Sequence, residues 1–138
     1  MMVLVDTPVW SLSLRRKATD LAPVERRITK NLYELVRQQR VRLLGSTRQE
    51  VLSGIREESA FLRIRDHLRG FVNVELDESD YEEAARATKR CIRRGITGSN
   101  ADLLMCAVAV RHDWQIFSTD HDFTHYGQVL PIQLFELA

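Results

Sequence analysis

Short β-rich runs alternate with longer helical segments along this chain, and this order constrains its fold more than any other sequence feature. Runs rich in valine, leucine, isoleucine and phenylalanine predict strands at residues 2–5, 41–44, 71–74, 115–117 and 129–134. Pro131 places the last strand at a sheet edge or a bulge. Strands that alternate with helices predict a mostly parallel sheet with right-handed crossovers, and so an α/β fold.

Apolar spacing and start signals mark the helical segments. Thr7 and Pro8 predict a helix with the threonine as its cap and the proline at its first helical position. Another helix is predicted to begin at Ser46 or Thr47, with Glu50 in its first turn. Ser99 or Asn100 is expected to cap the helix that ends at Asp113. The remaining helices are predicted over residues 22–39, 59–68, 81–94 and, at the surface, 123–127.

The length of 138 residues fits one domain, residues 1–138, with a single core. The longest apolar stretch, residues 101–110, is interrupted by Asp102 and is too short to cross a bilayer. No basic segment precedes the N-terminal apolar run, so we expect a cytoplasmic protein without a signal peptide. Cys91 and Cys106 form no zinc or disulfide framework, and two reduced thiols are expected.

Four carboxylates lie where an apolar run ends or a helix begins: Asp6, Glu50, Asp102 and Asp120. In an open α/β sheet the carboxyl ends of parallel strands share one edge, and ligands bind outside that edge. We therefore expect these side chains to meet in one pocket, where a hard divalent cation such as Mg²⁺ balances their charge. Each carboxylate alone also fits a turn or a helix start, so the prediction rests on their joint placement.

Positive charge is concentrated in the first half of the chain. Residues 1–69 contain 14 Lys and Arg against 8 Asp and Glu, whereas residues 70–138 contain 6 against 11. Arginine can bind two phosphate oxygens at once, so Arg15, Arg16 and Lys17 are candidates to hold a polyanion. The same basic residues also fit the solvated faces of amphipathic helices.

Several other sites found in α/β proteins lack their motifs here. No G-x-G-x-x-G follows Val5, the chain has no P-loop motif, and Asp6 has no second aspartate two residues further on. His121 and His125 are one helical turn apart, beside Asp122, and leave a transition-metal site open as an alternative. The chain contains no His-Glu-x-x-His motif to support that alternative.

With these residues located, the sequence resembles PIN-domain ribonucleases of the VapC toxin type over essentially its whole length. The resemblance rests on VLVDTPVW at residues 3–10, TRQEVLSG at 47–54, NADLLMCAVA at 100–109 and STDHDF at 118–123. The chain departs from the family at Pro8, where relatives carry Ser or Thr, and at Cys106, where they carry a small residue. The resemblance implies a three-layer PIN-like fold with a central sheet of about five strands flanked by helices.

The resemblance also implies a metal-dependent endoribonuclease that uses Mg²⁺ or Mn²⁺ to cleave structured RNA such as tRNA or rRNA. It assigns metal binding to Asp6, Asp102 and Asp120, whereas Glu50 would either bind the metal through water or orient the attacking water. Three residues would support these ligands: Asp122, Thr119 and Asn100. Asp122 would alternatively bind a second ion. Arg15, Arg16 and Lys17 would contact flanking phosphates of the RNA.

The partners implied by the resemblance are an RNA substrate, a cognate VapB-like antitoxin whose C-terminal segment fills the active-site groove, and a second copy of the chain in a homodimer. No membrane partner is expected. Two other functions fit the same sequence: a non-catalytic RNA-binding protein with this fold, and a metal-dependent phosphatase or DNA nuclease.

Overall fold

The computed structural model describes residues 1–138, apart from the side chain of Arg15. Its strands are β1 (Val3–Val5), β2 (Val41–Leu43), β3 (Val72–Asn73), β4 (Gln115–Phe117) and β5 (Gln133–Leu134). Its α-helices are α1 (Thr7–Arg15), α2 (Pro23–Arg37), α3 (Gly45–Ser53), α4 (Glu58–Leu68), α5 (Glu78–Arg93), α6 (Asn100–His112) and α7 (Asp122–Tyr126). A 3₁₀ turn, Ala18–Asp20, separates α1 from α2.

The five strands form one parallel sheet in the order β3-β2-β1-β4-β5. The first strand in sequence therefore lies at the centre, with Val3 in register with Val41 on one side and with Gln115 on the other. The strand that follows Pro131 lies at the edge of the sheet, as predicted. The carboxyl ends of all five strands consequently face the same way.

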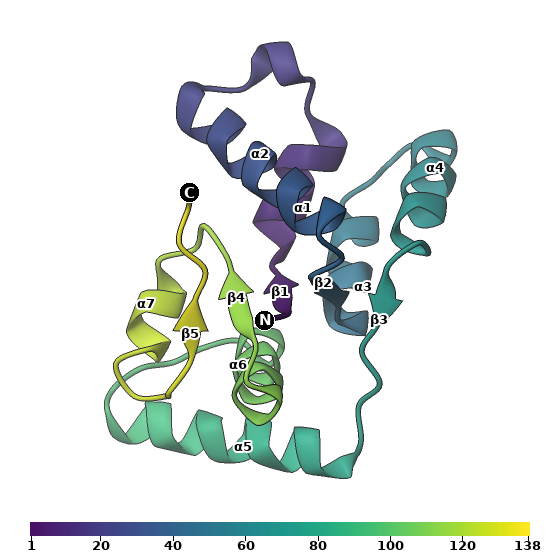
Figure 1. Cartoon of the computed structure of the whole chain (residues 1–138). Coiled ribbons are helices and arrows are strands. Elements are labelled where there is room, and N and C mark those ends of the chain that lie inside the picture. The colour runs from purple at the N-terminus through teal and green to yellow at the C-terminus, as the bar shows by residue number, and fades with distance from the viewer.

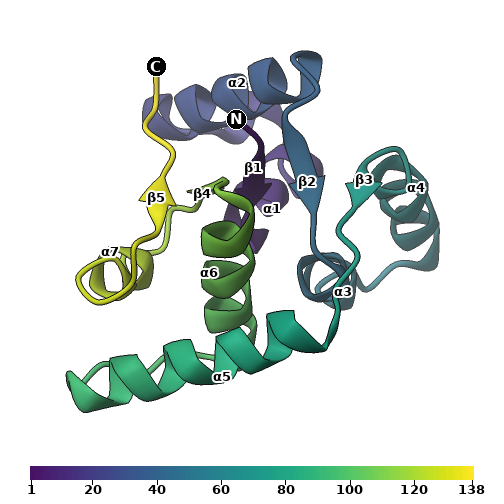
Figure 2. The ribbon, with the colours of Figure 1, turned by 60° about the horizontal axis from the view of Figure 1, so that its bottom comes forward.

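Helices cover both faces of the sheet, and the strand side chains alternate between two cores. Val3 and Val5 pack with residues of α1, α2 and α4, whereas Leu4 packs with residues of α5, α6 and α7. Figure 1 separates these layers, with α1 and α2 above the strands and α5 and α6 below them. The view in Figure 2 shows α5 lying along the outer side of the molecule, next to α6. The predicted three-layer α/β architecture is confirmed.

Two hydrogen bonds help to fix the packing of these elements. The indole nitrogen of Trp10 donates to the carbonyl oxygen of Val5 at 3.0 Å, which anchors α1 to the end of β1. Arg111 of α6 donates to Asp80 of α5, whose side chain is buried, at 2.6 Å. Because a buried carboxylate without a partner is costly, this pair helps to determine how α5 packs on α6.

Helix α6 is largely buried and carries one of the two free cysteines. Cys106 and Cys91 of α5 are both buried thiols, and burial raises the pKa of each. The expectation of two unpaired thiols is confirmed. Among the described residues, no helix combines the length and apolar character needed to cross a membrane.

Two helices begin earlier than predicted, and both shifts affect site residues. Helix α1 starts at Thr7, so that Asp6 is the cap position and Pro8 is the second helical residue. Helix α3 starts at Gly45, because Leu44 is buried in the core and its carbonyl oxygen already accepts from the backbone N–H of Arg48. Glu50 therefore lies in the second turn of α3, and the prediction of a first-turn position was wrong.

The C-terminal segment also departs from the predicted boundaries. Only Gln133 and Leu134 of residues 129–134 form a strand, because residues 127–130 form a turn and a bend and Pro131, which follows them, has no backbone N–H to donate. The short helix predicted at the surface is present as α7, but Phe123 and Tyr126 are buried. One side of α7 therefore packs into the core, and this places Tyr126 beside the carboxylates described below.

Candidate active site

Asp6 lies at the carboxyl end of the central strand β1, next to α1. Its side chain is only 7% exposed, and one carboxylate oxygen accepts a hydrogen bond from Ser118 Oγ at 2.8 Å. Burial raises the pKa of Asp6 to about 6, and the charges of Asp102 and Glu50 add to this effect, whereas the bond from Ser118 opposes it. The site thus contains an acid whose ionised form is disfavoured in the absence of a cation.

Asp102 is the third residue of α6 and faces the same centre from another element. Ser99 caps the helix, as its Oγ accepts from the backbone N–H of Asp102 at 3.1 Å. The hydroxyl of Tyr126 donates to Asp102 Oδ2 at 2.8 Å. Burial is the main cause that raises the pKa of Asp102, followed by the charges of Asp120 and Glu50, while the Tyr126 and Ser99 hydrogen bonds lower it.

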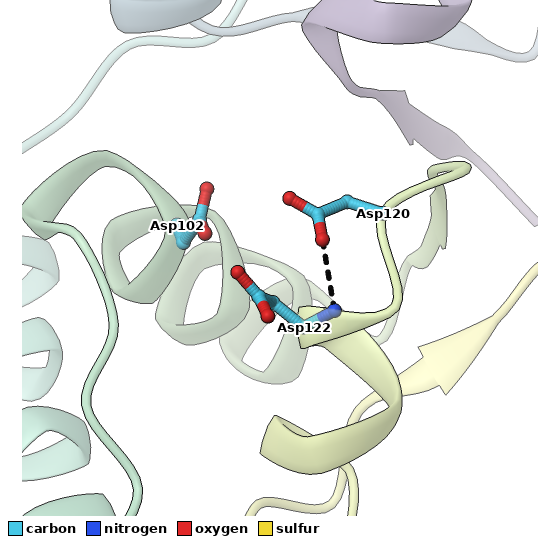
Figure 3. Close-up of side chains that lie close together, drawn as sticks. All are labelled: Asp102, Asp120 and Asp122. Atoms are coloured by element: carbon cyan, nitrogen blue, oxygen red, sulfur yellow. Dashed lines mark hydrogen bonds between the residues drawn. The ribbon is translucent and has the colours of Figure 1, made fainter.

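Asp120 and Asp122 follow β4 in a turn held by side-chain hydrogen bonds. Ser118 Oγ accepts from the backbone N–H of Asp120 at 3.0 Å, and Asp120 Oδ1 accepts from the backbone N–H of Asp122 at 2.9 Å. Figure 3 shows the carboxylates of Asp102, Asp120 and Asp122 directed toward a common space. One oxygen from each of these three side chains lies within 4.8 Å of the others.

Glu50 lies on α3, and its carboxylate accepts a hydrogen bond from a residue of α1. Thr7 Oγ1 donates to Glu50 Oε2 at 2.8 Å. The charge of Glu50 raises the pKa of both Asp6 and Asp102, so its carboxylate is close to theirs. Pro8 is exposed, and the side-chain hydroxyl contact at this end of α1 comes from Thr7.

The donor set fits a hard divalent cation. Carboxylate oxygens are the ligands that Mg²⁺ and Mn²⁺ prefer, and three of them approach one another closely here. The site has five acids: Asp6, Glu50, Asp102, Asp120 and Asp122. Among the described side chains, no Lys or Arg makes an ion pair with any of them. Asp6 lies outside the group of three, although the sequence led us to expect it among the ligands, and Asp122 lies within it. His121 and His125 are exposed and do not belong to that group.

The structure distributes the expected supporting residues unevenly. Thr119 is exposed, and the hydrogen bonds to the neighbouring acids come from Ser118. Asn100 lies in a groove between α5 and α6 that also includes Tyr81 and Leu104. Asn100 is the first residue of α6, and among the described side chains it makes no hydrogen bond to the carboxylates.

The basic residues expected near the substrate are partly engaged within the protein. Arg16 pairs with Glu25 at 2.8 Å and donates to the carbonyl oxygen of Asp20 at 3.3 Å. Lys17 is exposed at the start of the 3₁₀ turn. The side chain of Arg15 lies outside what the structure describes. Part of the charge of this segment is therefore offset by Glu25.

Sequence reasoning did not identify three hydroxyl donors, which are Ser118, Thr7 and Tyr126. Ser118 stands two residues before Asp120, a spacing that fits a side chain accepting the aspartate N–H, so a local signal for it existed. The pairing of Tyr126 with Asp102 spans 24 residues and that of Thr7 with Glu50 spans 43. These two pairings depend on how helices pack, and local sequence patterns carry no signal for them.

Comparison with known proteins identifies the family of this arrangement. A model of the PIN domain matches residues 3–129. The chain belongs to the PIN-domain family. The resemblance drawn from the sequence motifs is thereby confirmed, and each of the five acids lies within the matched region of this PIN domain.

Relatives of this PIN domain include a curated protein and solved structures. Ribonuclease VapC11 of Mycobacterium tuberculosis is 27% identical over 134 residues, which cover 96% of both chains. The solved structure of VapBC2 from Rickettsia felis, bound to a DNA fragment from its promoter, has a TM-score of 0.77 at 11% identity and covers 100% of both chains. FitAcB from Neisseria gonorrhoeae has a TM-score of 0.72 at 19% identity and covers 98% of this chain and 97% of its own. At these identities the two structures establish the fold alone.

Proposed function

We propose that this PIN domain, residues 1–138, is a VapC-type toxin: a cytoplasmic endoribonuclease that hydrolyses RNA phosphodiester bonds. The observation that carries the proposal is the convergence of five acids, with no ion-paired cation among the described side chains, at the carboxyl edge of the sheet. A relative over nearly the whole chain, named Ribonuclease VapC11, supports RNA as the substrate. We further propose structured RNA, such as tRNA or rRNA, as the target.

In this proposal the acidic centre holds Mg²⁺ or Mn²⁺. Asp6, Asp102 and Asp120 are the ligands, and Asp122 adds a fourth carboxylate because one of its oxygens lies close to those of Asp102 and Asp120. A divalent cation bound there supplies positive charge that admits a phosphodiester and stabilises the negative charge that develops on it during hydrolysis.

The side chains of the protein then position the reactants. Glu50 has one oxygen engaged by Thr7, which leaves its other oxygen to accept a hydrogen bond from the attacking water and to orient it. Ser118 holds Asp6 and the backbone of Asp120 together, and Tyr126 holds Asp102. These neutral donors fix the orientation of the acids without cancelling their charge. The basic segment of Arg15, Arg16 and Lys17 binds a flanking phosphate of the RNA.

A cognate VapB-like antitoxin and a homodimeric assembly complete the proposal. Support for the antitoxin comes from the similarity in fold to VapBC2, whose name joins a VapC protein to its partner. Co-expression with the product of a neighbouring small gene should give a complex that elutes as one species and suppresses cleavage.

Light scattering of the isolated chain should give twice its mass, and a monomeric mass would contradict the dimer.

The test is cleavage of RNA by the purified protein. We expect cleavage in Mg²⁺ or Mn²⁺, none in EDTA, and a loss on the order of 100-fold in Asp6→Asn and Asp102→Asn, since each removes a proposed ligand. Asp113→Asn is the matched control, because Asp113 ends α6 and bonds Gln133, away from the site. Equal cleavage by all four proteins would contradict the assignment.

Substrate class is tested with the same proteins. A panel of RNA, DNA and small phosphate esters distinguishes a ribonuclease from a DNA nuclease or a phosphatase. A protein that binds RNA with a strong salt dependence but cleaves nothing in any divalent metal would be a non-catalytic RNA-binding PIN domain. Sequencing of RNA ends after brief expression would then identify the target.

A further inference from the structure

A second basic surface lies on α5, in the half of the chain that has more acids than bases. Of the 6 Lys and Arg in residues 70–138, five lie within residues 86–94, a stretch that contains no Asp or Glu. They are Arg86, Lys89, Arg90, Arg93 and Arg94, and we call them the α5 stripe. The acids of the same helix are confined to its first part, residues 78–83.

The members of the α5 stripe share one side of the helix, because they recur at intervals of three and four residues. Ala87 and Cys91, on another side, are buried in the core that α5 shares with α6. All five basic side chains are exposed. Among the described side chains, only Arg86 has an acidic partner, Glu83, at 3.8 Å. The stripe therefore presents positive charge that the protein itself leaves almost unneutralised.

The helix dipole does not account for the whole stripe. Cations are favoured near the C-terminus of a helix, but this effect fades beyond the last turn. Arg90, Arg93 and Arg94 lie in or just after that turn, whereas Arg86 and Lys89 extend further toward the middle of α5. A role that uses exposed charge along about two turns of helix explains all five residues.

The end of the stripe leads directly into the helix that carries Asp102. Gly95, with a φ of 74°, reverses the chain after α5, and the backbone N–H of Ile96 donates to the carbonyl oxygen of Cys91 at 2.9 Å. Gly98 then lies against the ring of Tyr126, whose hydroxyl holds Asp102. Figures 1 and 2 both place the C-terminal end of α5 on the α7 side of the molecule. The stripe is thus joined to the acidic centre by a short, well-packed connection.

We propose that the α5 stripe binds the phosphate backbone of the RNA substrate at a distance from the bond that is cut. The proposal rests on the ribonuclease function proposed above and adds to it a second contact region, distinct from Arg15, Arg16 and Lys17. Arg and Lys contacts to phosphate carry no base preference, so the stripe supplies affinity and orientation for long, folded RNA. Base selection remains with the groups around the acidic centre.

The test compares two triple variants with equal loss of charge. The stripe variant carries Arg90→Gln, Arg93→Gln and Arg94→Gln. The control variant carries Arg26→Gln, Lys30→Gln and Arg63→Gln, which alter exposed cations of α2 and α4 that make no ion pair with the described side chains. Both are made in an Asp120→Asn background, so that binding of a labelled, folded RNA is measured without cleavage, over a range of salt concentrations.

We expect the stripe variant to bind RNA roughly tenfold more weakly and to lower the slope of log affinity against log salt by about 2. The control variant should bind within about twofold of its parent. Equal affinity of the stripe variant and its parent, or an equal loss in both variants, would overturn the proposal. If the stripe variant melts below the control, the three single substitutions are measured instead, each with an expected slope change of about 0.7.

The experiments distinguish an α5 stripe that does not bind RNA from a protein that is not a ribonuclease. Cleavage is measured separately with unsubstituted Asp120. Absent cleavage together with stripe-dependent RNA binding would contradict the nuclease and support the stripe. Normal cleavage together with unchanged binding of the stripe variant would contradict the stripe and support the nuclease.

Discussion

Three acids of the site are each held by a neutral hydroxyl from a different element. Ser118 donates to Asp6, Thr7 to Glu50 and Tyr126 to Asp102, at 2.8 Å in each case. A hydroxyl orients a carboxylate but leaves its full negative charge. An arginine or lysine in the same place would have neutralised the acid and competed with a cation. The choice of donors therefore keeps the centre both ordered and strongly attractive to a divalent ion.

Replacement of Tyr126 by Phe should weaken metal binding. The change removes the donor that fixes one oxygen of Asp102, and loss of such an outer hydrogen bond costs on the order of 10-fold in metal affinity. Calorimetric titration of the metal-free protein with Mn²⁺ measures this directly. Tyr33→Phe, at an exposed position of α2, serves as the control and should bind Mn²⁺ as the unmodified protein does. Unchanged affinity of the Tyr126→Phe variant would refute the positioning role.

Replacement of Asp6 by Asn should stabilise the metal-free protein while it lowers the cleavage activity. Asp6 is buried beside two other carboxylates, which raises its pKa from 3.8 to about 6. Since one pKa unit corresponds to about 1.4 kcal/mol, the variant should gain roughly 3 kcal/mol of unfolding free energy at pH 7. Urea denaturation in EDTA measures the gain, and a loss of stability would show that the charge of Asp6 is not a burden to the fold.

At the scale of elements, the loop between α5 and α6 supports the site by packing against Tyr126. A Cβ atom at Gly98 would lie 2.7 Å from the ring and the hydroxyl of Tyr126. Only glycine allows the loop to pass so close to the ring, and the same ring packs edge-on against Phe123 at 5.2 Å between centroids. The loop, α7 and the start of α6 thus form one packed unit around Tyr126.

Gly98→Ala should therefore disturb the site although residue 98 carries no reacting group. We expect a loss of about 1 to 3 kcal/mol in unfolding free energy from overpacking. Mn²⁺ affinity should fall together with it, because Tyr126 must move away from Asp102. Gly45→Ala is the matched control, since its Cβ would meet no atom within 4 Å at the start of α3. Equal stability and metal affinity of the two variants would contradict this role of Gly98.

For the molecule as a whole, the site is a meeting point of segments from four parts of the chain. Asp6 follows β1, Glu50 lies on α3, Asp102 lies on α6, and Asp120 and Asp122 follow β4. The parallel sheet brings these ends together against their mutual repulsion. A bound cation would relieve that repulsion only in the folded protein, because the unfolded chain separates the acids.

Divalent metal should accordingly raise the melting temperature. At a metal concentration 100 times its dissociation constant, the gain is about 2.7 kcal/mol, or on the order of 10 °C for a chain of this size. Differential scanning calorimetry with Mg²⁺ or Mn²⁺ measures the shift against NaCl of equal ionic strength. Asp102→Asn should lose most of it, and an equal shift in that variant would place the binding elsewhere.

The sequence by itself determined the architecture and the location of the acids. Apolar runs and helix spacing are local patterns, so they predicted five strands, their alternation with helices and the carboxyl-edge positions of Asp6 and Asp120. Only the tertiary structure decided which oxygens approach one another. It grouped Asp122 with Asp102 and Asp120, and it supplied Ser118 to Asp6 across 112 residues. Such contacts depend on how whole helices and strands pack, and no local pattern in the chain encodes that geometry.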